Sequence, residues 1–214
     1  MNLAYPGIYP EEFATPVPEE RLAGVLARYG IRKPYLLFVG RLEQKKNVRN
    51  LVEAFAVLKR EHGVAHQLVL AGRPGYGYDA IRQSVEASGV VENVVETGWV
   101  ADEDLPALLQ GARLFIFPSS YEGFGIPILQ AQAAGTPVAC SDIPVFREVA
   151  GSGVAYFDER SPEDMARVAA SALREPGGGE AHSATGRRNL GRFTWPGTAG
   201  VVWETIQGLS LDIL

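Results

Sequence analysis

Two polar loops hold the side chains of this sequence that could bind an anion. Arg41 and Lys46 follow an apolar run, and Glu122 lies in a second loop that contains two glycines. An arginine can bind a diphosphate through two parallel hydrogen bonds, and a lysine supplies a compact point charge. The second loop, residues 118–125, leads into a helical pattern, so free backbone amides at the helix start would face an anion. A phosphate-bearing ligand is therefore the first hypothesis.

Apolar runs and helical patterns alternate along the chain and would position both loops. The apolar runs are short and bounded by glycine, proline or polar residues, as strands are. They cover residues 35–39, 67–71, 94–97, 114–117, 137–140 and 154–157. The helical patterns between and after them cover residues 48–58, 79–88, 105–111, 128–134 and 165–173.

The predicted strands are too apolar to leave one face of a sheet in water. We therefore expect an α/β fold, a Rossmann-like parallel sheet of about six strands with helices on both faces. Ligands of such sheets bind at the carboxyl ends of the strands, so the two polar loops would converge there.

Two helix starts carry residues that are typical caps. Asn47 precedes the first helical stripe and is expected to cap it. Ser161 precedes Pro162, which suits the first position of a later helix, so Ser161 is expected to cap that helix.

Composition, charge and the single cysteine narrow the possible functions. The chain has 46% hydrophobic and 21% charged residues, as ordinary globular proteins do. A net charge of -5 disfavours nucleic acid as the main partner, because duplex binders concentrate positive charge. Cys140 cannot form an internal disulfide and is expected to be a buried, reduced thiol. Neither a bilayer-spanning run nor a signal pattern occurs, so we expect a cytoplasmic protein, peripheral at the inner membrane face in a longer enzyme.

Three segments resemble the C-terminal, donor-binding half of family-4 retaining glycosyltransferases of the GT-B fold. They are Gly40 to Asn47, Phe117 to Pro127 and Ala134 to Val138, in the family's order and approximate spacing. The resemblance implies transfer of a hexose, with retention, from a nucleoside diphosphate sugar to a saccharide or lipid-linked acceptor. GDP-mannose is the favoured donor. The implied setting is polysaccharide biosynthesis.

The resemblance gives each charged candidate a role. Gly40 would belong to the donor-binding loop. Arg41, which follows it, and Lys46 would bind the diphosphate and stabilise the charge that develops on the departing oxygen. Glu122 would bond hydroxyl groups of the sugar. The family has a second glutamate eight positions later, which bonds the ribose, and here that residue is Gln130. An amide hydrogen-bonds more weakly than a carboxylate, so we expect weakened donor affinity.

The start of the helix after Glu122 would supply backbone contacts. The amides of Phe124, Gly125 and Ile126 would point at sugar or phosphate oxygens, and glycine at positions 123 and 125 permits a close approach. Gly123 and Gly125 are also what a tight strand-to-helix turn needs without any ligand, and this alternative stays open.

Loops after the second and third predicted strands would complete the donor site. Arg73 would be a third cation near the diphosphate, with simple solvent exposure as the alternative. Val100 would meet the base through its backbone. Trp99 is expected to pack rather than to stack on a base.

We expect neither a metal nor a cofactor other than the donor substrate. The sequence has no pair of aspartates after a strand that resembles a metal-binding motif, so Arg41 and Lys46 would take the place of a divalent cation. The spacing of His62, His66 and His182 suits no metal site.

The expected organisation has three parts. Residues 1–33 resemble an interdomain linker with a first helix, residues 34–176 the nucleotide-sugar-binding domain, and residues 177–214 a helical tail that would cross to an N-terminal acceptor domain. That domain is not in this sequence, so the chain alone should be inactive or weakly active. The glycines at 177–179 predict a flexible break. The apolar tail, residues 195–209, should fold back onto its own domain or pair between chains.

Two other functions are compatible with these patterns. A catalytically weakened nucleotide-sugar-binding or regulatory module would share the fold, with Gln130 marking lost catalysis and the tail docking a partner chain. Another GT-B enzyme, such as a nucleotide-sugar epimerase, would need acid and base residues, for which no matching histidine or carboxylate set is found.

Overall fold

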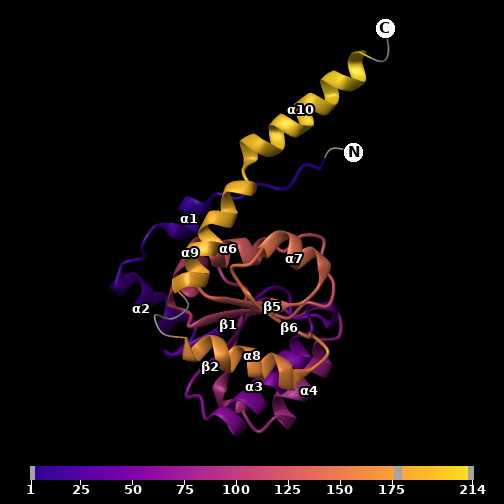
Figure 1. Cartoon of the computed structure of the whole chain (residues 1–214). Coiled ribbons are helices and arrows are strands. Elements are labelled where there is room, and N and C mark those ends of the chain that lie inside the picture. Colours follow the sequence, from indigo (N-terminus) through magenta and orange to yellow (C-terminus); the bar gives the residue numbers. More distant parts are fainter. Residues whose placement is uncertain (1–2, 176–179, 212–214) are drawn as a thin grey trace.

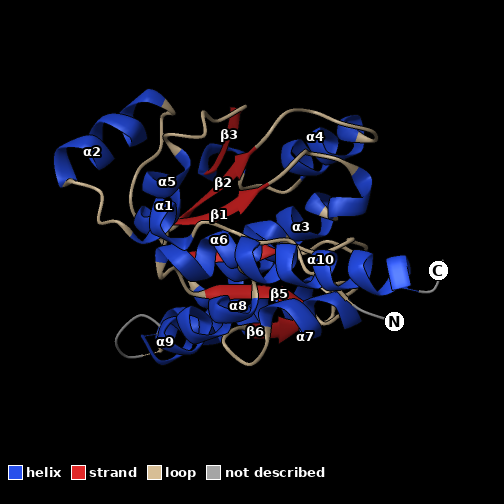
Figure 2. Cartoon of the chain, turned by 90° about the horizontal axis from the view of Figure 1, so that it is seen from above, coloured by secondary structure: helices blue, strands red, loops and turns tan. Residues whose placement is uncertain are grey.

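Short apolar segments form one parallel sheet whose carboxyl edge carries the candidate loops. The computed structural model describes residues 3–175 and 180–211. The strands are β1 (Tyr35–Val39), β2 (Gln67–Ala71), β3 (Val94–Gly98), β4 (Leu114–Phe117), β5 (Val138–Ser141) and β6 (Ala155–Phe157). Their order is β3-β2-β1-β4-β5-β6, and every neighbouring pair is parallel. The expected Rossmann-like sheet is therefore confirmed (Figure 2).

The strand order reverses between β1 and β4. The first three strands extend to one side of β1, and the last three extend to the other. The chain therefore continues from β1 and from β4 to helices on opposite faces of the sheet, and the place between these two loops at the carboxyl edge, here called the crevice, is where sheets of this kind bind ligands.

Helices cover both faces of the sheet (Figure 1). One face carries α3 (Val48–His62), α4 (Tyr78–Ala87) and α8 (Pro162–Arg174). The other carries α5 (Leu105–Gly111), α6 (Ile126–Ala134) and α7 (Pro144–Ala150), with α1 (Pro10–Ala14), α2 (Glu19–Arg28) and α9 (Glu180–Asn189) packed outside them. Short 3₁₀ helices are η1 (Gln44–Lys46), η2 (Val91–Asn93) and η4 (Leu190–Arg192). β2 and β4 are buried along their whole length, as the apolar runs predict.

One of the two capping predictions is confirmed and the other is wrong. Ser161 Oγ accepts a hydrogen bond from Asp164 N at 3.1 Å, so Ser161 caps α8. Asn47 precedes α3 with a φ of 55°, in the left-handed region, and its side chain makes no capping bond. Its Nδ2 instead donates to Glu159 O at 2.7 Å. A capping side chain needs an extended backbone at its own residue, which Asn47 lacks.

The N-terminal segment is bonded to α5 through one side chain. Gln110 Nε2 donates to Phe13 O at 2.7 Å and to Thr15 O at 2.8 Å. Its Oε1 accepts from Val17 N at 2.9 Å. This amide therefore fixes the chain between α1 and α2 against the sheet domain.

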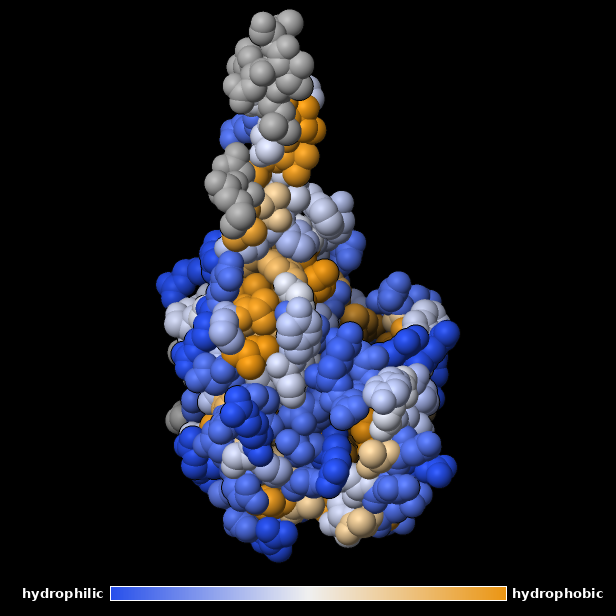
Figure 3. Space-filling model, turned by 90° about the vertical axis from the view of Figure 1, so that its right-hand side faces the viewer, coloured by the Kyte–Doolittle hydropathy of each residue, from blue (hydrophilic) through white to orange (hydrophobic). Residues whose placement is uncertain are grey.

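The tail ends in α10 (Trp195–Leu211), which extends away from the sheet domain (Figure 1). Its side chains Val202, Trp203 and Ile206 are exposed, and the projecting helix shows apolar surface in Figure 3. Thr198, in the first turn of α10, still donates to Tyr5 O, whereas for residues 199–208 the expectation that the tail folds back onto its own domain is wrong. Pairing between chains stays a prediction.

Three other predictions concern the flexible break at the glycines 177–179, the burial of the Cys140 thiol, and the absence of a bilayer-spanning segment. The glycines at 177–179 lie outside the described residues. Cys140, in β5, is buried as predicted, and burial raises the pKa of its thiol far above the ordinary value. Over residues 3–175 and 180–211, no helix has both the length and the hydropathy needed to cross a bilayer.

Candidate functional site

Lys46 and Glu122 form an ion pair across the crevice where the strand order reverses. Lys46 lies in the loop after β1 and Glu122 in the loop after β4, and Lys46 Nζ donates to Glu122 Oε1. Ser119 Oγ donates to the same oxygen at 2.9 Å. The two charged side chains are 15% and 14% exposed, so solvent screens the pair only in part. Two residues predicted to act on the donor are thus brought together.

The loop after β1 holds the Lys46 side chain toward the sheet. Lys46 is the last residue of η1, and Ser120 N donates to Lys45 O at 3.0 Å, which ties η1 to the loop after β4. Lys46 Nζ lies 5.4 Å from the ring centre of Phe117, at the end of β4. The neighbouring Lys45 side chain is 60% exposed. Of these two lysines, only Lys46 therefore faces the crevice.

Glycines let the loops after β1 and β2 meet at backbone distance. A Cβ on Gly72 would lie 1.9 Å from the carbonyl oxygen of Gly40, so a side chain at position 72 would clash. Leu42 N donates to Arg73 O at 2.9 Å. These contacts place Arg73 beside the loop that carries Arg41.

An open cleft of about 540 Å³ lies at the carboxyl ends of β1, β2 and β3. It is lined by Val39, Gly40, Arg41, Ala71, Gly72, Arg73, Trp99, Val100, Asp102 and Leu105. Four residues predicted to bind the donor therefore share it: Gly40, Arg41, Arg73 and Val100. Arg41 is exposed, and its guanidinium forms no ion pair with the part of the chain that the structure describes.

The structure contradicts the packing prediction for Trp99. Its side chain is 57% exposed, and the guanidinium carbon of Arg73 lies 5.7 Å from its ring centre. β3 is the edge strand of the sheet, so the residue that follows it borders solvent. The indole therefore forms part of the cleft wall.

The two glycines before α6 differ in backbone conformation and in the space available for a side chain. Gly125 has a φ of 107°, and a Cβ there would lie 3.0 Å from Phe146 Cε1, so the backbone and the packing demand glycine. At Gly123 a Cβ would meet nothing within 4 Å, and φ is not in the left-handed region. Contacts with the described residues therefore do not require a glycine at position 123.

The backbone at the start of α6 is held by the side chain of Phe124. Its ring lies 6.0 Å from the ring of Tyr5 and 5.5 Å from that of Phe193, measured between centres. No hydrogen-bond acceptor for the amides of Phe124, Gly125 and Ile126 is found within residues 3–175 and 180–211. These amides can therefore donate to a bound molecule.

Two predicted residues, Ile126 and Gln130, lie within α6. Ile126 is 41% exposed, and Gln130, one turn later, is half-buried. Neither lines the cleft of about 540 Å³. The predicted residues thus form two groups at one edge of the sheet, the first in the cleft and the second around the ion pair and the start of α6.

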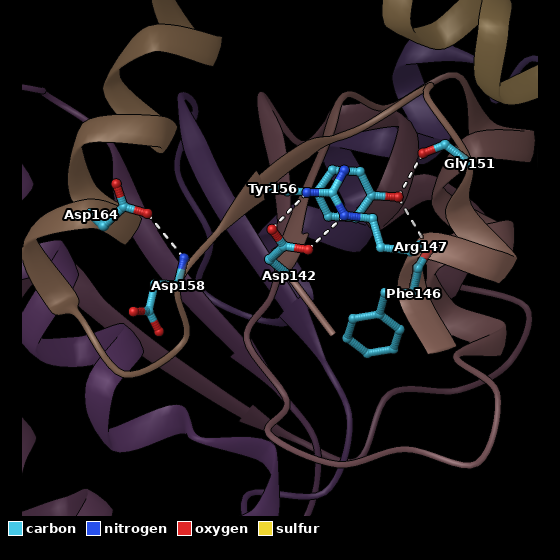
Figure 4. Close-up of polar contacts among 7 residues, drawn as sticks. All are labelled: Asp142, Phe146, Arg147, Gly151, Tyr156, Asp158 and Asp164. Carbon is cyan, nitrogen blue, oxygen red and sulfur yellow. Dashed lines mark hydrogen bonds and ion pairs between the residues drawn. The ribbon is translucent and has the colours of Figure 1, made fainter. Parts of the chain in front are cut away.

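Asp142, Arg147 and Tyr156 form a polar cluster near Phe146 that no sequence motif indicated (Figure 4). Arg147 donates to both carboxylate oxygens of Asp142 at 2.6 Å, and its guanidinium carbon lies 4.0 Å from the ring centre of Tyr156. The hydrogen bonds from Arg147 hold the pKa of Asp142 below its ordinary value. Tyr156 OH donates to Gly151 O at 2.6 Å, and Phe146 O is a second, longer acceptor at 3.1 Å. The cluster thereby fixes Phe146, whose ring packs on Gly125.

The histidines described by the structure do not form a site. His66 Nδ1 is buried without a hydrogen-bond partner, and burial lowers the pKa of this imidazole. Across the described residues, no three His, Cys, Asp or Glu side chains are grouped so that they could hold a metal ion.

Comparison with known proteins gives the chain a family. The model of the glycosyl transferases group 1 family matches residues 28–189, and the chain belongs to this family. The chain is 34% identical over 172 residues to O-antigen chain mannosyltransferase B of Escherichia coli, a match that covers 80% of the chain and 45% of the relative. Serotype-specific mannosyltransferase WbdA of Escherichia coli is 30% identical over 197 residues, which are 91% of the chain and 24% of the relative. The chain therefore spans less than half the length of these relatives.

Solved structures confirm the fold. Sucrose-phosphate synthase from Thermosynechococcus elongatus has a TM-score of 0.80 at 23% identity, covering 97% of this chain and 52% of that protein. Anabaena Alr3699/HepE in complex with UDP and glucose has a TM-score of 0.79 at 17% identity, covering 97% of this chain and 56% of the other. The chain thus has the fold of one half of a GT-B glycosyltransferase, as the sequence motifs predict.

Proposed function

We propose that this chain is the donor-binding domain of a retaining hexosyltransferase that uses a nucleoside diphosphate sugar. The observation that carries the proposal is the ion pair between Lys46 and Glu122 at the reversal of strand order, with Arg41 at the adjacent cleft. The cations suit the diphosphate, and the carboxylate suits the hydroxyl groups of the sugar. The diphosphate and the sugar of such a donor would both be bound at one edge of the sheet.

The two cations would act on the leaving group. In transfer, the bond between the anomeric carbon and the diphosphate oxygen breaks, and the electron pair stays on that oxygen. Arg41 and Lys46 would stabilise this charge more strongly in the transition state than in the ground state, which is what accelerates a reaction. Lys46 has three N–H donors, so it can keep its bond to Glu122 and still donate to a phosphate oxygen. In this proposal they take the role of a divalent metal, and no cofactor is required.

GDP-mannose is the donor we favour. The cleft of about 540 Å³ has the size of small-molecule sites, and Asp102 lines it next to Val100. Guanine presents two neighbouring N–H donors to a carboxylate such as Asp102, whereas uracil presents one. Relatives of the chain are named mannosyltransferases, which supports mannose as the sugar of the donor.

Gln130 favours a second candidate, a nucleotide-sugar-binding or regulatory module with weakened catalysis. Its amide cannot make the charge-assisted bond that a carboxylate makes to a ribose hydroxyl. We prefer the enzyme, because Lys46 and Glu122 are paired and Arg41 is exposed, with no ion pair to any residue that the structure describes. Transfer that is recovered by Gln130→Glu in the presence of an acceptor domain would favour the enzyme, and continued inactivity would favour the module.

In our proposal, residues 34–176 bind the donor and α10 reaches an acceptor domain, which would bind a saccharide or a lipid-linked acceptor. Trp203 in α10 is 61% exposed, and apolar surface of this kind usually meets a partner. The chain alone would then bind the donor and transfer little. Self-association through α10 is the alternative, and light scattering that shows dimers at rising protein concentration would support it.

Titration calorimetry of the 214-residue chain with GDP-mannose, UDP-glucose and related donors tests the function. The expected result is saturable binding of GDP-mannose that is tighter than binding of UDP-glucose. An absence of binding heat with every donor would contradict the proposal.

A further inference from the structure

Residues at the end of α2 hold the turn that follows β3. Tyr29 OH donates to Asp104 Oδ2 at 3.0 Å and accepts from the backbone N–H of Ala101 at 3.3 Å. Arg28 Nη1 donates to the same carboxylate oxygen of Asp104 at 2.6 Å. One tyrosine hydroxyl thus joins both ends of the turn, residues 101–104.

The carboxylate of Asp104 is committed to this contact. Asp104 occupies the N-cap position of α5, where an aspartate side chain commonly accepts from the amides of its own helix, yet it makes no such bond. Its side chain is only 4% exposed, and a buried carboxylate needs donors to offset its lost hydration. Arg28 and Tyr29 supply those donors. The link between α2 and the turn is therefore a specific one.

A second contact from α2 reaches the same turn. Arg21 Nη2 donates to Glu103 O at 2.6 Å. α2 also lies beside α5, the helix that continues from the turn (Figure 2). The turn is therefore held from α2 at its start, middle and end.

The turn that α2 holds is also a wall of the cleft. Val100 and Asp102 line the cleft, while the neighbouring Ala101 and Asp104 are bonded to Tyr29. We propose that Tyr29 and Asp104 are positioning residues for the nucleobase end of the donor. The proposal rests on the proposed function and adds to it a set of residues that fixes base affinity from outside the site.

The physical reason is the cost of ordering a backbone on binding. If Val100 meets the base through its backbone, affinity depends on how well that backbone is fixed before the base arrives. Tyr29 holds the amide of the next residue, Ala101, and loss of its hydroxyl would loosen that contact. Arg41 and Lys46 belong to a different loop, so the diphosphate contacts would stay as they are.

Two tyrosine variants give a matched test. Tyr29→Phe removes only the hydroxyl that bonds the turn. Tyr35→Phe is the control, because Tyr35 OH donates to Leu108 O in α5 at 2.7 Å from a fully buried side chain that does not line the cleft. Each 214-residue chain is titrated with GDP, and hydrogen exchange of the amides of residues 99–104 is measured without ligand.

We expect Tyr29→Phe to weaken GDP binding by about fivefold or more and to speed exchange at Ala101, the loss expected for one hydrogen bond. Tyr35→Phe should lower the melting temperature but keep GDP affinity within about twofold, since it leaves the turn intact. Unchanged GDP affinity in Tyr29→Phe would overturn the positioning role alone. Failure of the unchanged chain to bind GDP would contradict the proposed function, and the positioning role with it.

Discussion

Lys46 and Glu122 are 76 positions apart in sequence, and their ion pair joins the loops on the two sides of the strand-order reversal. Each residue would be an ordinary surface charge if its loop were considered alone. Together they place a cation and a carboxylate at the start of α6, beside a cleft that holds Arg41. The proposed donor site follows from this juxtaposition.

Arg41 should contribute to donor binding and not to folding. Its guanidinium is exposed and forms no ion pair with the described residues, so Arg41→Ala should leave the melting temperature unchanged. Loss of a charge-assisted hydrogen bond to the diphosphate should weaken GDP-mannose binding by about 10- to 100-fold. Lys45→Ala is the control in the same loop, because Lys45 is exposed and pairs with Glu43. Equal affinities for the two variants would argue against the role of Arg41.

The pair of Lys46 and Glu122 should stabilise the folded chain. Lys46→Met, Glu122→Gln and the double variant form a mutant cycle for the free energy of unfolding. We expect a coupling of about 1 kcal/mol, because the pair is largely buried but still touches water. A coupling near zero would mean that the two loops are held together by other contacts.

Gly123→Ala and Gly125→Ala should differ in their effect on the free energy of unfolding. Gly125→Ala should lower the free energy of unfolding by about 1–3 kcal/mol, because φ is 107° and the added Cβ meets Phe146. Gly123→Ala adds a Cβ to open space, so stability should change by less than about 0.5 kcal/mol.

Binding of GDP-mannose gives a second test of the role of Gly123. Gly123→Ala should weaken GDP-mannose binding in calorimetry, since the added methyl group would occupy the space of the donor. A Gly123→Ala chain that binds as tightly as the unchanged one would remove the argument from this glycine.

The ion pair of Asp142 and Arg147 should be lost in acid. The pKa of Asp142 is lowered in the folded chain by hydrogen bonds from Arg147, so its contribution to stability is present above the unfolded pKa of about 3.9. That contribution is lost as the pH falls through the folded pKa. The difference in free energy of unfolding between the unchanged chain and Asp142→Asn should be constant above about pH 5 and shrink below about pH 4. A difference that persists unchanged in stronger acid would contradict this origin.

The sheet could be predicted from the sequence because each strand is a short apolar run bounded by polar residues, glycine or proline. The runs at 35–39 and 114–117 coincide with β1 and β4, and Ser161 caps α8 as a serine before a proline suggests. Each of these features depends on neighbours in sequence and on burial, both of which an apolar pattern reports.

Features that depend on distant partners were not predictable in this way. The side chain of Asn47 donates a hydrogen bond to Glu159 O instead of capping its own helix, and Trp99 is exposed because β3 is an edge strand. Nothing in the pattern around Tyr29 or Asp104 indicates that they bond each other across 75 positions. Such contacts exist only once the topology has brought the elements together.

The location of the diphosphate of bound GDP tests the central claim most directly. A crystal structure of the 214-residue chain with GDP should show phosphate oxygens within hydrogen-bond distance, about 2.7–3.2 Å, of Arg41, Lys46 and the amide of Gly125 or Ile126. GDP bound with its diphosphate remote from these groups would contradict the account.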